Sequence, residues 1–294
     1  MYAIDKKDLL NWCSIPVDKL AGNSPRVPFE VVENSEQMGR MMARELVDDV
    51  RKNNDKDKNT RAIIPCGPAC WYKPLAEIIN SERVSLGRLE VFHMDECLDW
   101  QGNPLPAGHP YNFRSEMERV FYGPIDIELA VPEKNRHWLT PRTLDRVREQ
   151  IEAAPIDITL GGWGQDGHIA YNQARREPFS MLSLDEVRSS SIRVQYNNPD
   201  TVIALAQRTL GSAWQFIPPM SVTLGVKECL SARKVRVYSD TGAWKQTAFR
   251  VALFSRPTPE YPMTLLQEHP DARVTATRET ATHPISVHPE WELI

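Results

Sequence analysis

The stretch from Gly161 to Asn172, GGWGQDGHIAYN, carries the residue types best suited to proton transfer. Asp166 stands two residues before His168 in what should be a tight loop, where a carboxylate can orient or charge the imidazole. Histidine is the usual proton shuttle near neutral pH, and glycines allow positive φ and a close approach of the backbone to a ligand. The glycines match neither GxGxxG nor GxxxxGK[ST], so no nucleotide fingerprint is present. The pattern favours acid–base chemistry, with a glycine-rich turn around a structural histidine as the simpler alternative.

Two adjacent carboxylates follow the apolar run 89–93, LEVFH. Neighbouring side chains at the end of a strand point in different directions. One of Asp95 and Glu96 can therefore face a pocket while the other anchors it. An acidic turn without chemistry is the alternative interpretation.

A lysine follows the run 234–239, KVRVYS, through a Thr-Gly turn, and it stands where a helix should begin. A cation at a helix N-terminus opposes the helix dipole, so the presence of Lys245 makes sense if an anion binds there. Free backbone N–H groups and an ammonium group together form a phosphate site. A solvated surface lysine is the alternative. A similar turn, 66–71, follows the run 61–65 but offers no hydroxyl group.

These residues all follow short apolar runs that alternate with helical patterns. Strands or apolar runs are expected at 61–65, 89–93, 156–161, 191–196, 234–239 and 272–277. Helices are expected at 35–52, 72–80, 144–151 and 242–254, with Asn34 or Ser35 able to cap the first. The alternation predicts an α/β fold with an open, mostly parallel sheet covered on both faces. Ligands bind beyond the carboxyl ends of such strands, which is where the candidate residues lie.

The composition is that of an ordinary globular protein of 294 residues, with 41% hydrophobic and 25% charged residues. A net charge of −4 leaves no strongly basic surface, so nucleic acid is not expected as a partner. No apolar run approaches the roughly 20 residues that span a bilayer, and the N-terminus lacks the features of a signal peptide. We therefore expect a cytoplasmic protein with no membrane partner. The five cysteines are odd in number and Cys66 and Cys70 form only CxxxC, so neither a disulfide framework nor a metal site is expected.

Several stretches resemble the glucosamine-6-phosphate deaminase/isomerase family. They are FHMDE (92–96), the loop 161–172, the segment 221–248 and the segment 265–281 near the C-terminus. The order DGH, then IA, an aromatic residue and Asn favours these deaminases over the related 6-phosphogluconolactonases. The resemblance covers roughly 28–281 and implies a Rossmann-like three-layer α/β/α sandwich in one domain. Residues 1–27 are then an N-terminal extension and 282–294 a C-terminal tail.

The family turns an amino-sugar phosphate into a ketose phosphate and ammonia, and the motif match implies a role for each catalytic residue. Asp95 would be the general base that moves a proton between C2 and C1. His168 would open the sugar ring by shuttling a proton to and from the ring oxygen, and Asp166 would support it. A positioned base contributes about 10²–10⁴-fold to the rate. The scheme requires no metal and no cofactor.

The resemblance also implies how a small-molecule sugar phosphate would be bound. Lys245 matches the family's phosphate-binding lysine, and Arg208 falls on its arginine by gap-free counting back from the TLGV stretch. Glu96 and the turn of Gly67, Pro68 and Ala69 would complete the substrate site.

Two positions depart from the family's pattern. The family usually has Gly-Thr where this chain has Pro68-Ala69, and the change removes an N–H and a hydroxyl donor. It usually has Glu where this chain has Gln173, which is expected to act in catalysis beside His168. A glutamine can hydrogen-bond to the imidazole but cannot stabilise an imidazolium by charge.

Three functions stay open on the sequence. The first is the isomerising deamination of an amino-sugar phosphate or an uncommon relative of it. The second is a sugar-phosphate lactonase that uses His168 as a base on water and has no need of Asp95. The third is a non-catalytic sugar-phosphate sensor, which the two departures favour, although no helix-turn-helix precedes the domain. A homo-oligomer is compatible with the family, whose members differ in assembly.

Overall fold

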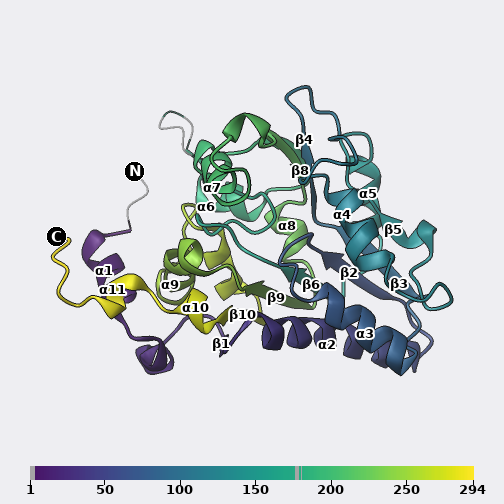
Figure 1. The fold of residues 1–294 in the computed structure, drawn as a ribbon, viewed down its shortest axis with the longest axis horizontal. Coiled ribbons are helices and arrows are strands. Elements are labelled where there is room, and N and C mark those ends of the chain that lie inside the picture. Colours follow the sequence, from purple (N-terminus) through teal and green to yellow (C-terminus); the bar gives the residue numbers. More distant parts are fainter. Residues whose placement is uncertain (1–3, 176–178, 180) are drawn as a thin grey trace.

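The computed structural model describes residues 4–175, 179 and 181–294, and its centre is a seven-stranded sheet (Figure 1). The strand order is β1-β10-β9-β6-β2-β3-β5, and every neighbouring pair is parallel. The strands of this sheet are β1 (Phe29–Val32), β2 (Thr60–Ile64), β3 (Leu89–His93), β5 (Arg136–His137), β6 (Ile158–Gly161), β9 (Lys234–Ser239) and β10 (Ala272–Thr277). The predicted three-layer α/β fold is confirmed.

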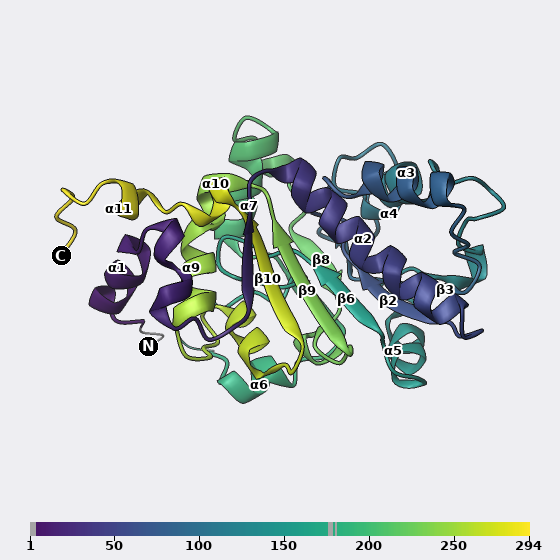
Figure 2. The same ribbon diagram turned by 90° about the horizontal axis from the view of Figure 1, so that it is seen from below.

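Helices cover both faces of the sheet (Figure 1). The α-helices of the described residues are α1 (Lys6–Ser14), α2 (Ser35–Asn54), α3 (Tyr72–Glu82), α4 (Phe113–Met117), α5 (Leu144–Glu152), α6 (Leu184–Arg188), α7 (Pro199–Thr209), α8 (Val226–Cys229), α9 (Gln246–Phe254), α10 (Arg278–Ala281) and α11 (Pro284–Val287). Figure 2 shows α2 and α3 side by side over one face, and α2 begins where the Asn34 side chain accepts a hydrogen bond from the Gln37 amide at 2.9 Å. The sequence therefore locates this helix start through its cap.

Successive side chains along a strand point to opposite faces of the sheet, so the core has two layers. Ala62 and Ile64 of β2 pack with α2 and α3 on one face, whereas Ile63 packs on the other face with α9. In the same way Val91 and Phe92 of β3 belong to opposite layers. Strands buried on both faces read as continuous apolar runs, which is why the sequence shows them so clearly.

A second sheet of three antiparallel strands stands beside the first. It consists of β4 (Asp95–Leu98), β8 (Met220–Thr223) and β7 (Arg193–Tyr196) in the order β4-β8-β7. The chain enters it directly from β3, since the Met94 amide donates to Ile64 in the large sheet and the Met94 carbonyl accepts from Leu224. The predicted strand at 191–196 is therefore real, but it belongs to this small sheet. Asp95 begins a strand, rather than sitting in a turn.

The segment before β1 packs onto the body of the protein. Helix α1 contacts α9 and α11, so the first and the last labelled helix lie side by side at one end of the molecule (Figure 1). Leu20 and Val27 are fully buried in the core layer of α9. Among the residues that the structure describes, none of the helices is both long and apolar enough to cross a bilayer.

Candidate active site

A cavity of about 640 Å³ opens at the carboxyl ends of four adjacent strands, β9, β6, β2 and β3. Each strand contributes the residues that follow it. The predicted site residues that line this cavity are Gly67, Pro68, Ala69, Asp95, His168, Arg208 and Lys245. The structure thus brings together residues that are as far apart in the chain as Gly67 and Lys245. Asp166 is buried directly behind His168, while Glu96 and Gln173 lie outside the cavity.

His168 is held by its neighbours on the same loop. Its Nδ1 lies 2.6 Å from the Oδ1 atom of the buried Asp166. A carboxylate at Nδ1 fixes the ring orientation and leaves Nε2 to exchange a proton with a ligand. The ring also stacks on Tyr171, with centroids 5.8 Å apart. Gly164 allows this packing, because a Cβ atom there would collide with the imidazole.

The histidine loop is tied to the small sheet beside Asp95. The Tyr171 amide donates to the Thr223 hydroxyl at 3.0 Å, and Thr223 is the residue that pairs with Asp95 between β8 and β4. The Asn172 amide group donates to the Leu224 carbonyl at 2.9 Å. These bonds place the imidazole and the Asp95 carboxyl group on the same cavity from two different sheets.

The Asp95 carboxyl group is set up to accept a proton near neutral pH. Burial, with a smaller contribution from the negative charge of Glu96, raises the pKa of Asp95 to about 8. Strongly shifted pKa values in a cleft are typical of catalytic acids and bases. Asp95 is therefore the best-placed proton carrier of the cavity beside His168.

Glu96 does not face the cavity, contrary to its expected place in the substrate site. Its carboxylate accepts backbone N–H groups from Cys97, Phe113 and Arg114 at 3.0, 2.8 and 2.8 Å. Two of these donors are at the start of α4, whose free amides favour a carboxylate. Of the two adjacent carboxylates, one faces the cavity and the other anchors a helix.

Two cations stand on the side of the cavity formed by α7 and the turn after β9. Burial and the nearby Arg208 guanidinium lower the pKa of Lys245 to about 7, although Asp240 and Asp166 oppose the shift. The Lys245 backbone is held by Trp163, whose indole N–H donates to the Lys245 carbonyl at 3.3 Å. The helix predicted at 242–254 begins as a 3₁₀ turn, Gly242–Lys245, before α9. Lys245 therefore caps α9 instead of lying within its first turn.

Gln173 forms no hydrogen bond with His168 in the part of the chain that the structure describes. Its amide oxygen accepts from the Asn198 backbone at 2.9 Å, and its amide nitrogen donates to the Thr201 hydroxyl. Both partners belong to the N-terminal end of α7. The hydrogen bond to the imidazole that a glutamine could form here is not made, because this side chain joins the histidine loop to α7.

The sequence analysis did not identify every residue of the cavity wall, and two of those it missed make informative contacts. Trp244 lies beside both cations, and Thr201 accepts hydrogen bonds from Gln165 and Gln173. The tryptophan was visible in the turn before Lys245, but nothing in the sequence ties it to Arg208. Thr201 has no local pattern at all, since its role depends on where α7 docks.

The described residues contain no group of three or more His, Cys, Asp or Glu side chains placed to hold a metal ion. All five cysteines are free. Cys66 and Cys70 line the cavity on either side of Pro68, and burial raises the pKa of both thiols. They are therefore uncharged at neutral pH.

Comparison with known proteins adds an independent line of evidence. No family model matches the chain. The glucosamine-6-phosphate deaminase of Caenorhabditis elegans is 32% identical over 232 residues, which cover 76% of this chain and 79% of that protein. The enzyme of the same name from Mannheimia succiniciproducens is 30% identical over 266 residues, covering 87% of this chain and 91% of its own length.

Solved structures share the fold. A monomeric glucosamine-6-phosphate deaminase superposes with a TM-score of 0.73 at 20% identity, over 87% of this chain and 99% of that one. A 6-phosphogluconolactonase from Trypanosoma cruzi gives 0.61 at 16% identity, over 88% and 97%. The two kinds of enzyme thus share the architecture, while the two curated sequence relatives named above are deaminases. With relatives at 30% identity or more over most of its length, the chain belongs to the glucosamine-6-phosphate deaminase family.

Proposed function

We propose that the protein catalyses the isomerising deamination of glucosamine 6-phosphate or a close amino-sugar phosphate. The products are a ketose phosphate and ammonia, with one water consumed. The observation that supports this most is the shared cavity, which Asp95 and His168, backed by Asp166, line together with Arg208 and Lys245. A sugar phosphate needs all three elements: a base for carbon, a shuttle for oxygen and cations for phosphate.

Ring opening falls to His168. The closed sugar must lose a proton from the C1 hydroxyl and gain one at the ring oxygen. An imidazole can do both because it changes charge near neutral pH. The carboxylate of Asp166 stabilises the imidazolium that forms between the two steps.

Proton transfer between carbons falls to Asp95. Its carboxylate removes the proton from C2 of the open-chain ammonium form, and a proton of the ammonium group passes to the C1 oxygen, which leaves an enolamine across C1 and C2. The same carboxyl group returns its proton to C1, and C2 becomes a protonated imine. Water adds to the imine and ammonia leaves, so the ketose phosphate forms. A carboxyl group whose pKa lies near 8 can both take and return a proton at pH 7 to 8.

Phosphate binding falls to Lys245 and Arg208, with little help from the turn after β2. Pro68 has no N–H and Ala69 no hydroxyl. The amide of Gly242 is also occupied, since it donates to the Thr280 hydroxyl at 3.0 Å. The two cations therefore carry most of the anion binding.

A sugar-phosphate lactonase is the second candidate, because 6-phosphogluconolactonases share the fold. Such an enzyme needs His168 to activate water but gives no task to Asp95. The shifted pKa of Asp95 at the cavity favours the deaminase.

The test is a product assay with purified protein. We expect ammonia and a ketose 6-phosphate in equal amounts from glucosamine 6-phosphate, and no ammonia from unphosphorylated glucosamine at the same concentration. Hydrolysis of 6-phosphogluconolactone without any ammonia release from amino-sugar phosphates would refute the proposal in favour of the lactonase.

A further inference from the structure

Trp244 lies against both cations of the cavity. The Cζ atom of Arg208 is 3.7 Å from the centroid of the indole ring, and Nζ of Lys245 is 4.7 Å from it. The three side chains come from two separate elements, since Arg208 is near the end of α7 and the other two belong to the turn after β9. A cation over an aromatic ring is attracted by the negative face of the ring.

The ring takes the place that a carboxylate usually fills. Within residues 4–175, 179 and 181–294, neither Arg208 nor Lys245 forms an ion pair with an acidic side chain. Asp240 and Asp166 act on Lys245 only from farther away. A carboxylate counter-ion would have to be displaced by an incoming anion, whereas an indole ring holds the cations and leaves their charge available.

Two like charges would otherwise separate. Arg208 is exposed, and its guanidinium disfavours the positive charge on Lys245. The two cations therefore repel each other unless another group attracts both of them. The turn after β2 offers only a weak substitute, because Pro68 has no N–H and neither Pro68 nor Ala69 has a hydroxyl group.

We propose that Trp244 is a positioning residue that sets the specificity for a phosphorylated sugar, by holding Arg208 and Lys245 close enough to bind one phosphate group together. The inference rests on the proposed function, which supplies the phosphorylated amino sugar as ligand. It makes anion binding in this protein depend on a ring that touches no reacting atom.

The experiment compares Trp244→Leu and Trp244→Phe with Trp100→Leu, a matched control at an exposed tryptophan outside the cavity. The probe is 2-amino-2-deoxyglucitol 6-phosphate, an open-chain alcohol that cannot be deaminated, and its binding is measured by titration calorimetry. We expect the leucine variant to bind it about tenfold more weakly, since two cation–π contacts are lost. The phenylalanine variant should lose about threefold or less, and the control should bind like wild type.

Two further readouts separate positioning from a general structural defect. In the assay with glucosamine 6-phosphate, the leucine variant should show a raised KM and a kcat within about threefold of wild type. Its affinity for unphosphorylated 2-amino-2-deoxyglucitol should be unchanged. If the leucine variant does not fold, as judged by its melting curve, Trp244→Met replaces it.

Equal affinity of wild type and Trp244→Leu for the phosphorylated probe would overturn the inference, as would an equal loss for the phosphorylated and unphosphorylated probes. Wild-type protein that binds no phosphorylated probe would overturn it too. Wild-type protein whose binding depends on Trp244 but which releases no ammonia would refute the proposed function and leave this inference supported.

Discussion

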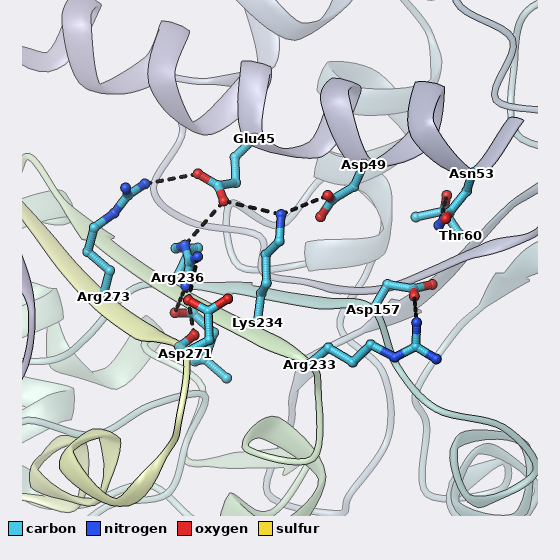
Figure 3. A network of polar contacts seen from close by, with 11 residues as sticks. Glu45, Asp49, Asn53, Thr60, Asp157, Arg233, Lys234, Arg236, Asp271 and Arg273 are labelled. Carbon is cyan, nitrogen blue, oxygen red and sulfur yellow. Dashed lines mark hydrogen bonds and ion pairs between the residues drawn. The ribbon is translucent and has the colours of Figure 1, made fainter. Parts of the chain in front are cut away.

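Acidic and basic side chains lie at both ends of the large sheet, but within the part of the chain that the structure describes they form ion pairs at the amino ends, whereas Asp95 and Lys245 at the carboxyl ends do not. At the amino ends of β9 and β10, Glu45 of α2 pairs with Arg236 and Arg273 at 3.2 and 2.9 Å, and Lys234 pairs with Asp49 at 2.7 Å (Figure 3). At the carboxyl ends, Lys245 and Asp95 have no such partners among the described residues, and both have strongly shifted pKa values.

This difference indicates that the charges at the amino ends stabilise the fold, whereas those at the carboxyl ends are free to act on a ligand. Paired charges at the amino ends fasten α2 to the sheet, because each side chain finds an opposite charge within hydrogen-bond distance (Figure 3). That end also has a cavity, of about 700 Å³, in which Lys234, Arg61 and Arg233 pair with Asp49, Glu90 and Asp157. The exposed lysines at its rim, Lys52, Lys56 and Lys58, form no ion pair among the described residues. A large hollow lined with charge is therefore not enough to indicate a site. What distinguishes the cavity at the carboxyl ends is the Asp166–His168 pair together with the shifted pKa values of Asp95 and Lys245.

The largest expected effect comes from the same substitution at the two ends. Asp95→Asn should lower kcat by about 10²–10⁴-fold, because an amide cannot accept the C2 proton. Asp49→Asn should leave kcat unchanged. The measurement is steady-state ammonia release, with melting curves to show that both proteins fold. Comparable losses in the two variants would break the comparison.

The second prediction concerns the pH profile of kcat/KM, which reports groups of the free enzyme. Activity needs Asp95 without its proton, which is favoured above about pH 8, and Lys245 with its proton, which is favoured below about pH 7. Only a minor fraction of the enzyme has both groups in the required state at any pH. The profile should therefore be bell-shaped with its maximum near pH 7.5, and its two apparent pKa values belong to the pair of groups, not to one residue each.

Lys245→Arg sharpens this prediction. An arginine stays charged, so the alkaline limb should disappear and activity should rise through about pH 8 to a plateau, whatever the loss at the maximum. The matched control, Lys234→Arg, should keep the bell-shaped pH profile of the wild type. An alkaline limb that persists in Lys245→Arg would show that another group sets it.

The third prediction tests the amino end. Glu45→Gln leaves Arg236, Arg273 and Lys234 with one fewer negative charge, and these side chains are only partly exposed. We expect a loss of roughly 2–3 kcal/mol in unfolding free energy, smaller than for a fully buried pair. Denaturant unfolding measures it, and kcat should stay at the wild-type value. A drop in kcat without a loss of stability would connect the network to catalysis.

The smallest effect is expected at Glu96→Gln. One backbone N–H at the start of α4 loses its acceptor, which costs about 1–2 kcal/mol. Removing the negative charge beside Asp95 lowers the pKa of that carboxyl group, so activity at pH 6 relative to pH 7.5 should increase. An unchanged ratio would mean that burial alone raises the pKa of Asp95.

The sequence predicts the large sheet well because its strands are buried on both faces. Strands β3 and β9 begin and end where the apolar runs 89–93 and 234–239 do. Of the small sheet the sequence predicts only β7: β4 begins with two carboxylates, and its partner β8 lies more than a hundred residues away. Pairing between such distant segments leaves no local pattern.

For the candidate site, too, the sequence predicted the residues that follow strands of the large sheet and failed where the partners lie on separate helices. Asp95, His168 and Lys245 were found because each follows a clear strand of the large sheet, and the ends of those strands converge. Glu96 and Gln173 were misplaced because their partners, the amides of α4 and the Thr201 hydroxyl of α7, depend on how separate helices dock. Trp244 was missed for that reason too, since Arg208 reaches it from α7.

The most direct measurement is a crystal structure of the protein with 2-amino-2-deoxyglucitol 6-phosphate. We predict its phosphate within hydrogen-bond distance of both Lys245 and Arg208, its C1 and C2 beside the Asp95 carboxyl group, and the Nε2 atom of His168 facing its oxygen atoms. A phosphate bound instead among Lys52, Arg233 and Lys234 at the amino ends, or a sugar turned away from Asp95, would contradict the account.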